Sequence, residues 1–132
     1  MAEKVEFELV SPERLLVSKP VDMVVVPGAE GDFGVLRGHA PLISTLRLGV
    51  IDVHDAGGVA DRIFVAGGFA EVTAERCTVL AEQAVRVADL DRAAVEAEIK
   101  DLRDRLAVAD NDGERTSLAA RIAVGEAKLA CL

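Results

Sequence analysis

Short apolar runs alternate with glycine, proline and polar residues through residue 82. The runs are rich in valine, leucine and isoleucine, and turn-forming residues separate them. They cover residues 5–10, 14–18, 21–27, 33–36, 41–48, 49–55, 62–68, 69–74 and 76–82. Short strands with regular turn signals are typical of a β-sandwich or barrel. The pattern therefore predicts an all-β domain over residues 1–87.

From residue 88 onward the apolar residues recur at helical spacing, and alanine, glutamate, arginine and leucine dominate. The apolar stripes are Val95, Ile99, Leu102 and Leu106 on a first helix, and Leu118, Ile122 and Leu129 on a second. Asp89 or Asp91 is expected to cap the first helix. Residues 110–113 contain Asp, Asn and Gly, which commonly end a helix. The pattern thus predicts a helix-turn-helix domain, an α-helical hairpin, over residues 88–132.

Three glycines give two further expectations. Gly67 and Gly68 follow an apolar run, which favours a hairpin turn between two strands. Gly125 lies inside the second predicted helix, where glycine costs about 1 kcal/mol relative to alanine. That helix is also expected to be short, ending just after Ala130.

Composition excludes several classes of function. A protein of 132 residues is too short for a multidomain enzyme. Aromatic residues make up 3% of it, with no Trp or Tyr, so nucleic-acid bases and sugar rings have little to stack on. The net charge of −8 repels phosphate backbones and anionic lipid. We expect no nucleic-acid partner and no direct insertion into lipid.

The two cysteines and the first residues of the sequence favour a reducing, cytoplasmic compartment. Cys77 and Cys131 have neither metal-ligand nor disulfide-framework spacing, which favours a reducing environment. The sequence shows no secretory leader and no membrane-spanning run of about 18 apolar residues. It also has no phosphate-binding loop, so we expect no bound cofactor. The protein is expected to remain cytoplasmic and to reach a membrane complex only through protein contacts.

The segment 26–42 is the most unusual part of the sequence, because four glycines and two prolines form two loops around one short predicted strand. His39 with Asp32 and Glu30 has the residue types of an acid–base site. However, no nucleophile elbow and no second histidine at ligand spacing accompany them. Loops on a rigid sheet commonly bind partners, so we expect a binding surface instead. His39 is expected either to hydrogen-bond within its own loop or to contact the partner.

Three segments together carry a resemblance to a known family. They are VPGAEGDFGVLRGHAPLIS at 26–44, FVAGGFAEV at 64–72 and TVLAEQAVRVADLD at 78–91. With the helical hairpin that follows, they resemble the epsilon subunit of the bacterial F-type ATP synthase over essentially the whole sequence. Chloroplast epsilon and mitochondrial delta subunits are also similar, but the lack of a transit peptide favours a bacterial source.

The resemblance implies a β-sandwich of about ten strands followed by a C-terminal α-helical hairpin. It also implies a non-catalytic central-stalk subunit that couples proton flow to ATP synthesis at the cytoplasmic face of the inner membrane. The implied partners are the gamma subunit, the c-subunit ring and the alpha/beta catalytic head. The family's ring-contact loops match Glu30, Gly31, Asp32, His39, Ala40, Pro41 and Leu42.

The alternative that the resemblance offers is mainly regulatory. In many members the hairpin inhibits ATP hydrolysis through basic residues, matched here by Arg103, Arg105, Arg115 and Arg121. A solvated helical face with local ion pairs is the other explanation of these charges. Because the second predicted helix is short and contains Gly125, we expect no strong inhibition through an extended hairpin.

Some members also bind ATP through an [IL]DxxRA motif at the start of the first helix. Asp91 matches this motif, but Ala94 stands at the arginine position and Arg92 lies two residues early. Two residues turn a side chain by about 200° around a helix, so Arg92 is expected to point away from a bound phosphate. Asp91 and Arg92 are the nucleotide-binding candidates, with helix capping as the competing role of Asp91.

Overall fold

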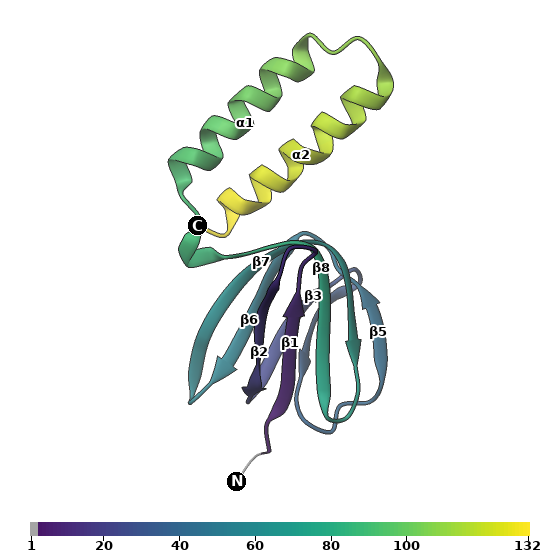
Figure 1. Cartoon of the computed structure of the whole chain (residues 1–132), viewed down its shortest axis with the longest axis vertical. Helices are drawn as coiled ribbons and strands as arrows, with labels where there is room; N and C mark the ends of the chain where they lie inside the picture. The colour runs from purple at the N-terminus through teal and green to yellow at the C-terminus, as the bar shows by residue number, and fades with distance from the viewer. Residues whose placement is uncertain (1–2) are drawn as a thin grey trace. The chain divides into compact units, whose positions relative to one another are not determined.

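The computed structural model describes residues 3–132, which form two compact units (Figure 1). The first unit extends to Ala88 and the second covers Asp89–Leu132. Within the described residues, the strands belong to the first unit and both α-helices belong to the second. Each unit has a hydrophobic core of its own, and the two cores share no residue.

Eight strands build the first unit in the described part of the protein. They are β1 (Val5–Val10), β2 (Leu15–Val21), β3 (Met23–Gly28), β4 (Gly31–Val35), β5 (Leu42–Thr45), β6 (Gly49–Asp55), β7 (Gly58–Val72) and β8 (Arg76–Arg86). The hydrogen-bonded order is β2-β1-β8-β7-β6-β3-β4, and β5 also pairs with β7. β1 and β8 run parallel, whereas all the other pairs are antiparallel.

The expected β-sandwich is confirmed, with eight strands in place of about ten. Two strands are long enough to serve both layers. β7 pairs with β6 up to Val65, and its last four residues, Phe69–Val72, pair with β5. β8 follows β7 along both parts. Because β7 and β8 each contribute to two layers, the eight strands provide ten strand segments.

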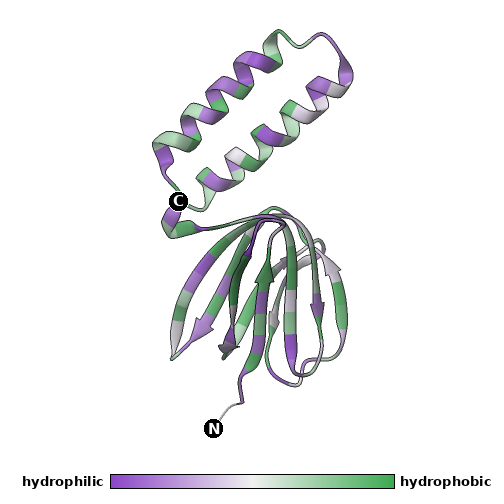
Figure 2. Cartoon of the chain, in the orientation of Figure 1, coloured by the Kyte–Doolittle hydropathy of each residue, from purple (hydrophilic) through white to green (hydrophobic). Residues whose placement is uncertain are grey.

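Alternation of apolar and polar residues builds the sandwich core. Figure 2 shows hydrophobic and hydrophilic residues alternating along several strands. The two layers turn their apolar faces toward each other, as in other sandwiches. The buried core comprises Val5, Phe7, Leu9, Val17, Val21, Val24, Val26, Val35, Leu46, Ile51, Val53, Ile63, Val65, Ala70, Val72, Cys77, Val79 and Ala81.

Gly67 and Gly68 lie inside β7, so the prediction of a hairpin turn between two strands was wrong. Both residues have positive φ, +75° and +104°, in the middle of a ladder that continues with β8. This backbone bends the strand and reverses the side that faces the core. Val65 faces inward before the bend and Ala70 faces inward after it, while Phe69 is exposed. The glycines thus let one strand cross from one layer to the other.

The second unit is the predicted helical hairpin. A short 3-10 turn (Val87–Asp89) precedes α1 (Arg92–Ala107) and α2 (Asp112–Ala130). Asp91 caps α1 as predicted, since its carboxylate accepts a hydrogen bond of 3.0 Å from the backbone N–H of Ala93. Asn111 caps α2 in the same way through the N–H of Glu114.

The apolar stripes predicted for the two helices form the core of the hairpin. The buried residues are Val95, Ile99, Leu102, Ala109, Leu118 and Ile122, with Leu106 and Leu129 packed at the edge. α2 has 19 residues against 16 in α1, so the expectation of a short second helix was wrong. A Cβ on Gly125 would lie 2.7 Å from Cγ1 of Ile99. Gly125 therefore allows the two helices to approach closely, which offsets its low helix propensity.

Candidate functional site

The first candidate surface begins at the turn between β3 and β4. Gly28 and Gly31 face each other across the hairpin, and Ala29 and Glu30 form its exposed tip. A Cβ on Gly28 would lie 2.8 Å from Cε1 of Phe33 and 2.9 Å from the Gly31 carbonyl oxygen. Glycine is therefore required for the two arms to approach this closely. The outcome is a narrow hairpin that presents Glu30 to solvent.

Hydrogen bonds to the last residue of β5 and to Arg47 just after it hold this tip in place. The backbone N–H of Ala29 donates to the Thr45 carbonyl at 2.9 Å, and that of Arg47 donates to the Pro27 carbonyl at 3.0 Å. The Arg47 guanidinium also donates to the Gly28 carbonyl at 2.6 Å and to the Asp32 carboxylate. Sequence reasoning missed Arg47, because no motif includes it and Asp32 lies fifteen positions away. Only the fold brings the two side chains together.

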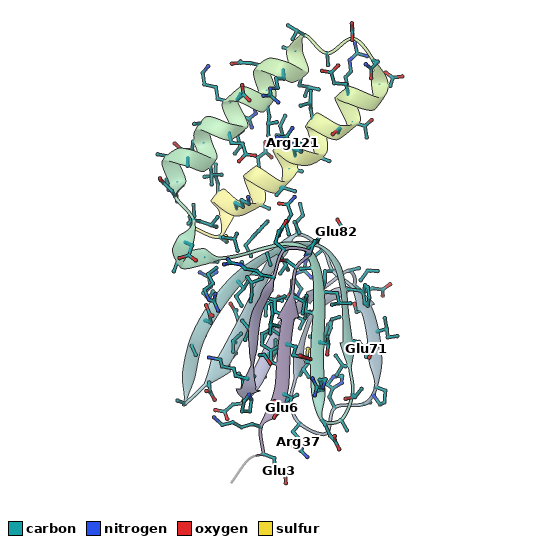
Figure 3. The ribbon with its side chains drawn as sticks, viewed as in Figure 1. Glu3, Glu6, Arg37, Glu71, Glu82 and Arg121 are labelled. Carbon is teal, nitrogen blue, oxygen red and sulfur yellow. The ribbon has the colours of Figure 1, made fainter. Side chains whose placement is uncertain are left out.

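The second predicted loop lies at the opposite end of β4. The five residues of β4 span roughly 15 Å, and residues 36–41 form the loop that follows. The N–H of Gly38 donates to the Ala74 carbonyl at 2.6 Å, which ties this loop to the turn between β7 and β8. In Figure 3, Arg37 lies at the same end of the sandwich as Glu3, whereas Glu82 lies at the other end.

His39 is engaged within its own loop. Its ring Nδ1 lies 2.7 Å from the Ala40 carbonyl oxygen, a geometry in which Nδ1 carries the proton and donates. Because Glu30 and Asp32 lie at the start of β4 and His39 lies beyond its other end, the structure does not assemble an acid–base site from these three residues. The hydrogen bond of His39 within its own loop is therefore present, while its contact with a partner stays a prediction.

A groove between β4 and β5 adjoins the tip of the β3–β4 hairpin. It has a volume of about 650 Å³ and is lined by Ala29, Glu30, Gly31, Asp32, Phe33, Leu42, Ile43, Ser44 and Thr45. Four of the seven predicted ring-contact residues line it, while Pro41 lines a neighbouring depression together with Leu42. Ile43 is 70% exposed and Leu42 38% exposed. The groove therefore combines an acidic tip with the apolar side chains of Leu42 and Ile43, while Ser44 and Thr45 add polar groups.

The four arginines predicted to contact catalytic subunits differ in their surroundings. Arg103 pairs with Glu126 across the hairpin at 2.6 Å, and Arg105 pairs with Asp101 one turn earlier at 3.2 Å. Arg115 donates to Asp112 and to the Ala109 carbonyl. Arg121 is exposed on α2, and its guanidinium has no ion pair or hydrogen bond with another residue of the described range 3–132 (Figure 3). Arg121 is thus the one of the four whose charge is not shared within the hairpin.

The other residues singled out in the sequence, Cys77, Asp91 and Arg92, have structural positions in the core or at the start of α1. Burial raises the pKa of the Cys77 thiol to about 12, so this core cysteine stays protonated at neutral pH. Asp91 uses one carboxylate oxygen as the helix cap, and Arg92 is exposed as the first residue of α1. None of the helices in residues 3–132 has the length and apolarity that crossing a bilayer requires.

Comparisons with known proteins assign both units. A family model described as the beta-sandwich domain of the ATP synthase delta/epsilon chain matches residues 4–87, and one described as the C-terminal domain of the ATP synthase epsilon chain matches residues 91–132. The protein belongs to the ATP synthase delta/epsilon family. The ATP synthase epsilon chain of Rhodospirillum rubrum is 57% identical over 130 residues, which is 98% of this protein and 97% of that relative. Family membership makes the protein an epsilon-type subunit of an F-type ATP synthase.

Solved structures of the family share the fold. A subunit in the Euglena gracilis mitochondrial ATP synthase, from a structure of OSCP, F1 and the c-ring, aligns with a TM-score of 0.82 at 22% identity and covers 99% of this protein and 82% of that subunit. A subunit in the central stalk and c-ring of the Tetrahymena thermophila mitochondrial ATP synthase aligns with a TM-score of 0.66 at 15% identity, covering 98% and 97%. At these identities the likeness supports the fold of the delta/epsilon family.

Proposed function

We propose that the protein is a non-catalytic rotor subunit of the central stalk, on the cytoplasmic face of the bacterial inner membrane. In this role it binds the gamma subunit and the c-subunit ring, and it couples proton flow to ATP synthesis. The observation that carries the proposal is the groove between β4 and β5, with the exposed carboxylate of Glu30 at its tip. A short hairpin fixed to a closely packed sandwich transmits force without deforming.

The surface proposed for the ring extends along β4 and β5 to both loops. Its members are Glu30, Gly31 and Asp32 at one end, and His39, Ala40, Pro41 and Leu42 at the other. The exposed Ile43 lies between them and adds apolar contact area. The carboxylate of Glu30 and the exposed apolar side chains of Leu42 and Ile43 fit a partner surface that offers a cation or N–H donors beside apolar side chains.

Glu30→Gln is expected to weaken binding to the ring without changing the fold. The measurement compares two preparations stripped of this subunit, the complete enzyme with its ring and the soluble catalytic head without it. Loss of one charge-assisted hydrogen bond lowers affinity for the complete enzyme roughly tenfold. Affinity for the head alone is expected to stay at the wild-type value, and ATP-driven proton pumping is expected to fall.

Glu96→Gln is the matched control, because it removes the same charge from an exposed position on α1. It is expected to bind both preparations as the wild type does. An equal loss with and without the ring for Glu30→Gln would contradict the proposed surface.

The second candidate function, inhibition of ATP hydrolysis by the hairpin, is favoured by the unshared charge of Arg121. If this guanidinium contacts an acidic loop of the catalytic subunits, Arg121→Ala is expected to weaken inhibition roughly tenfold in a titration of the head. Lys100→Ala is the control, since Lys100 is exposed, pairs with Asp104 on its own helix and is not one of the four predicted contacts. Equal inhibition by both variants and the wild type would rule out Arg121 as the contact. If the inhibition responds to ATP, Asp91 and Arg92 stay the residues predicted to bind it.

A further inference from the structure

Arg47 contacts both arms of the β3–β4 hairpin. Its backbone N–H donates to Pro27, and its guanidinium donates to the carbonyl of Gly28 and to the carboxylate of Asp32. Gly28 is the last residue of β3, and Asp32 is the second residue of β4. Arg47 thus donates to the β3 arm through two groups and to the β4 arm through one, on either side of the two-residue tip.

The shape of the guanidinium explains why one side chain reaches both arms. Arginine presents its donors in a rigid planar fork, whereas lysine carries a single ammonium group on a flexible stem. Pro27 pairs with Asp32 in the hairpin ladder, so the acceptors on the two strands lie side by side. Arg47 therefore fixes the spacing of the arms and, through them, the direction of Glu30.

The two acidic residues of the hairpin are in different electrostatic situations. The carboxylate of Asp32 is neutralised by Arg47. Glu30 has no ion pair or hydrogen bond with another residue in the described part of the protein, and it is exposed. The tip thus presents one unshared negative charge.

We propose that Arg47 is a positioning residue for the ring-binding tip, that Asp32 acts through Arg47, and that Glu30 makes the contact with the partner. This inference rests on the proposed rotor function. It divides the acidic loop into a contact residue and a support residue, and it adds Arg47, which lies outside the loop. The partner group facing Glu30 is then a cation or a cluster of N–H donors.

A double-mutant cycle on the full-length protein tests the division of roles. Asp32→Ala and Arg47→Ala are each expected to weaken binding to the ring-containing enzyme roughly tenfold, and the double variant no more than either single change. Binding to the ring-free head stays unchanged, which a general loss of stability would not allow. Arg47→Lys retains the charge and part of the bonding, so its loss is expected to be smaller.

Amide hydrogen exchange in the isolated full-length protein provides a second measurement. The N–H of Ala29, which donates to Thr45, is expected to exchange roughly tenfold faster in Arg47→Ala and in Asp32→Ala. Glu30→Gln is expected to leave this rate unchanged, because it removes a contact and not a support. Arg62→Ala is the control, since Arg62 forms a similarly exposed ion pair with Asp52 elsewhere on the sandwich.

The outcomes separate the inference from the proposed function. If Asp32→Ala weakens binding further in the Arg47→Ala background, Asp32 contacts the partner directly and the inference is overturned. Unchanged exchange at Ala29 in both variants overturns it as well. If Glu30→Gln binds the ring-containing enzyme as the wild type does, the proposed ring surface is wrong and the inference falls with it.

Discussion

Gly68→Ala is expected to lower the free energy of unfolding of the sandwich by about 3 kcal/mol or more. Two effects add at this position. The backbone has φ of +104°, which residues with a Cβ rarely adopt. A Cβ would also overlap the carbonyl oxygen of Leu80 and lie 2.9 Å from Cα of Ala81. Both obstacles are backbone atoms of β8, so no side-chain rotation relieves the overlap.

Gly57→Ala separates these two effects. Gly57 has φ of +87° in the turn before β7, but a Cβ there would meet no atom within 4 Å. This variant therefore carries only the conformational cost, about 1 kcal/mol. Urea denaturation of the full-length variants, followed by circular dichroism, measures the difference. Equal losses for Gly57→Ala and Gly68→Ala would show that β7 shifts away from β8 at little cost, contrary to the expected result.

The bend at Gly67 and Gly68 also shows where sequence reasoning reached its limit. Two adjacent glycines indicate positive φ angles, and both angles are indeed positive. The same angles occur in a hairpin turn and in a bent strand, because the local sequence does not specify which strand lies alongside. The pairing of β7 with β8 on both sides of the bend is a long-range property. The glycines expected to form a turn between two strands therefore bend a single strand. For this reason the sandwich has eight strands in the described residues, and not the expected ten.

The helical hairpin was predicted more fully, because its signals are local. Val95, Ile99 and Leu102 recur at helical spacing, and all three are buried in its core. Asp91 precedes the stripe and caps it, as capping preferences predict. The role of Gly125 was missed, since its contact with Ile99 depends on how two helices pack and not on the sequence around either residue.

The two loops of the candidate site were predicted from the sequence, but their geometry was not. Glu30 and His39 are in loops, as glycine and proline indicated, yet the loops lie at opposite ends of β4. The sequence indicated how many residues separate the two loops, but it did not indicate where each loop lies on the folded sandwich. No sequence signal pointed to Arg47, because the two acceptors of its guanidinium, Gly28 and Asp32, lie in the β3–β4 hairpin, far away in the sequence. Supporting residues of this kind emerge only when the strands are paired.

Leu102→Ala is expected to destabilise the hairpin by about 3 kcal/mol. Leu102 is 1% exposed and lies in the centre of a core of six buried residues. A two-helix unit of this size has little stability in reserve, because isolated helices are marginal in water. Loss of one central leucine is therefore expected to unfold α1 and α2 while the sandwich core, which shares none of these residues, stays folded.

Thermal unfolding of the full-length protein, followed in the helical and β regions of the circular dichroism spectrum, tests this expectation. Leu102→Ala is expected to lose helical signal at low temperature and to retain the β transition of the wild type. Leu106→Ala, at the edge of the same core, is the control and is expected to cost about 1 kcal/mol. A single transition that shifts as a whole would show that the two units unfold together. With separate transitions, Leu102→Ala supplies a protein that keeps the proposed ring surface and lacks an ordered hairpin, so coupling and inhibition can be measured independently.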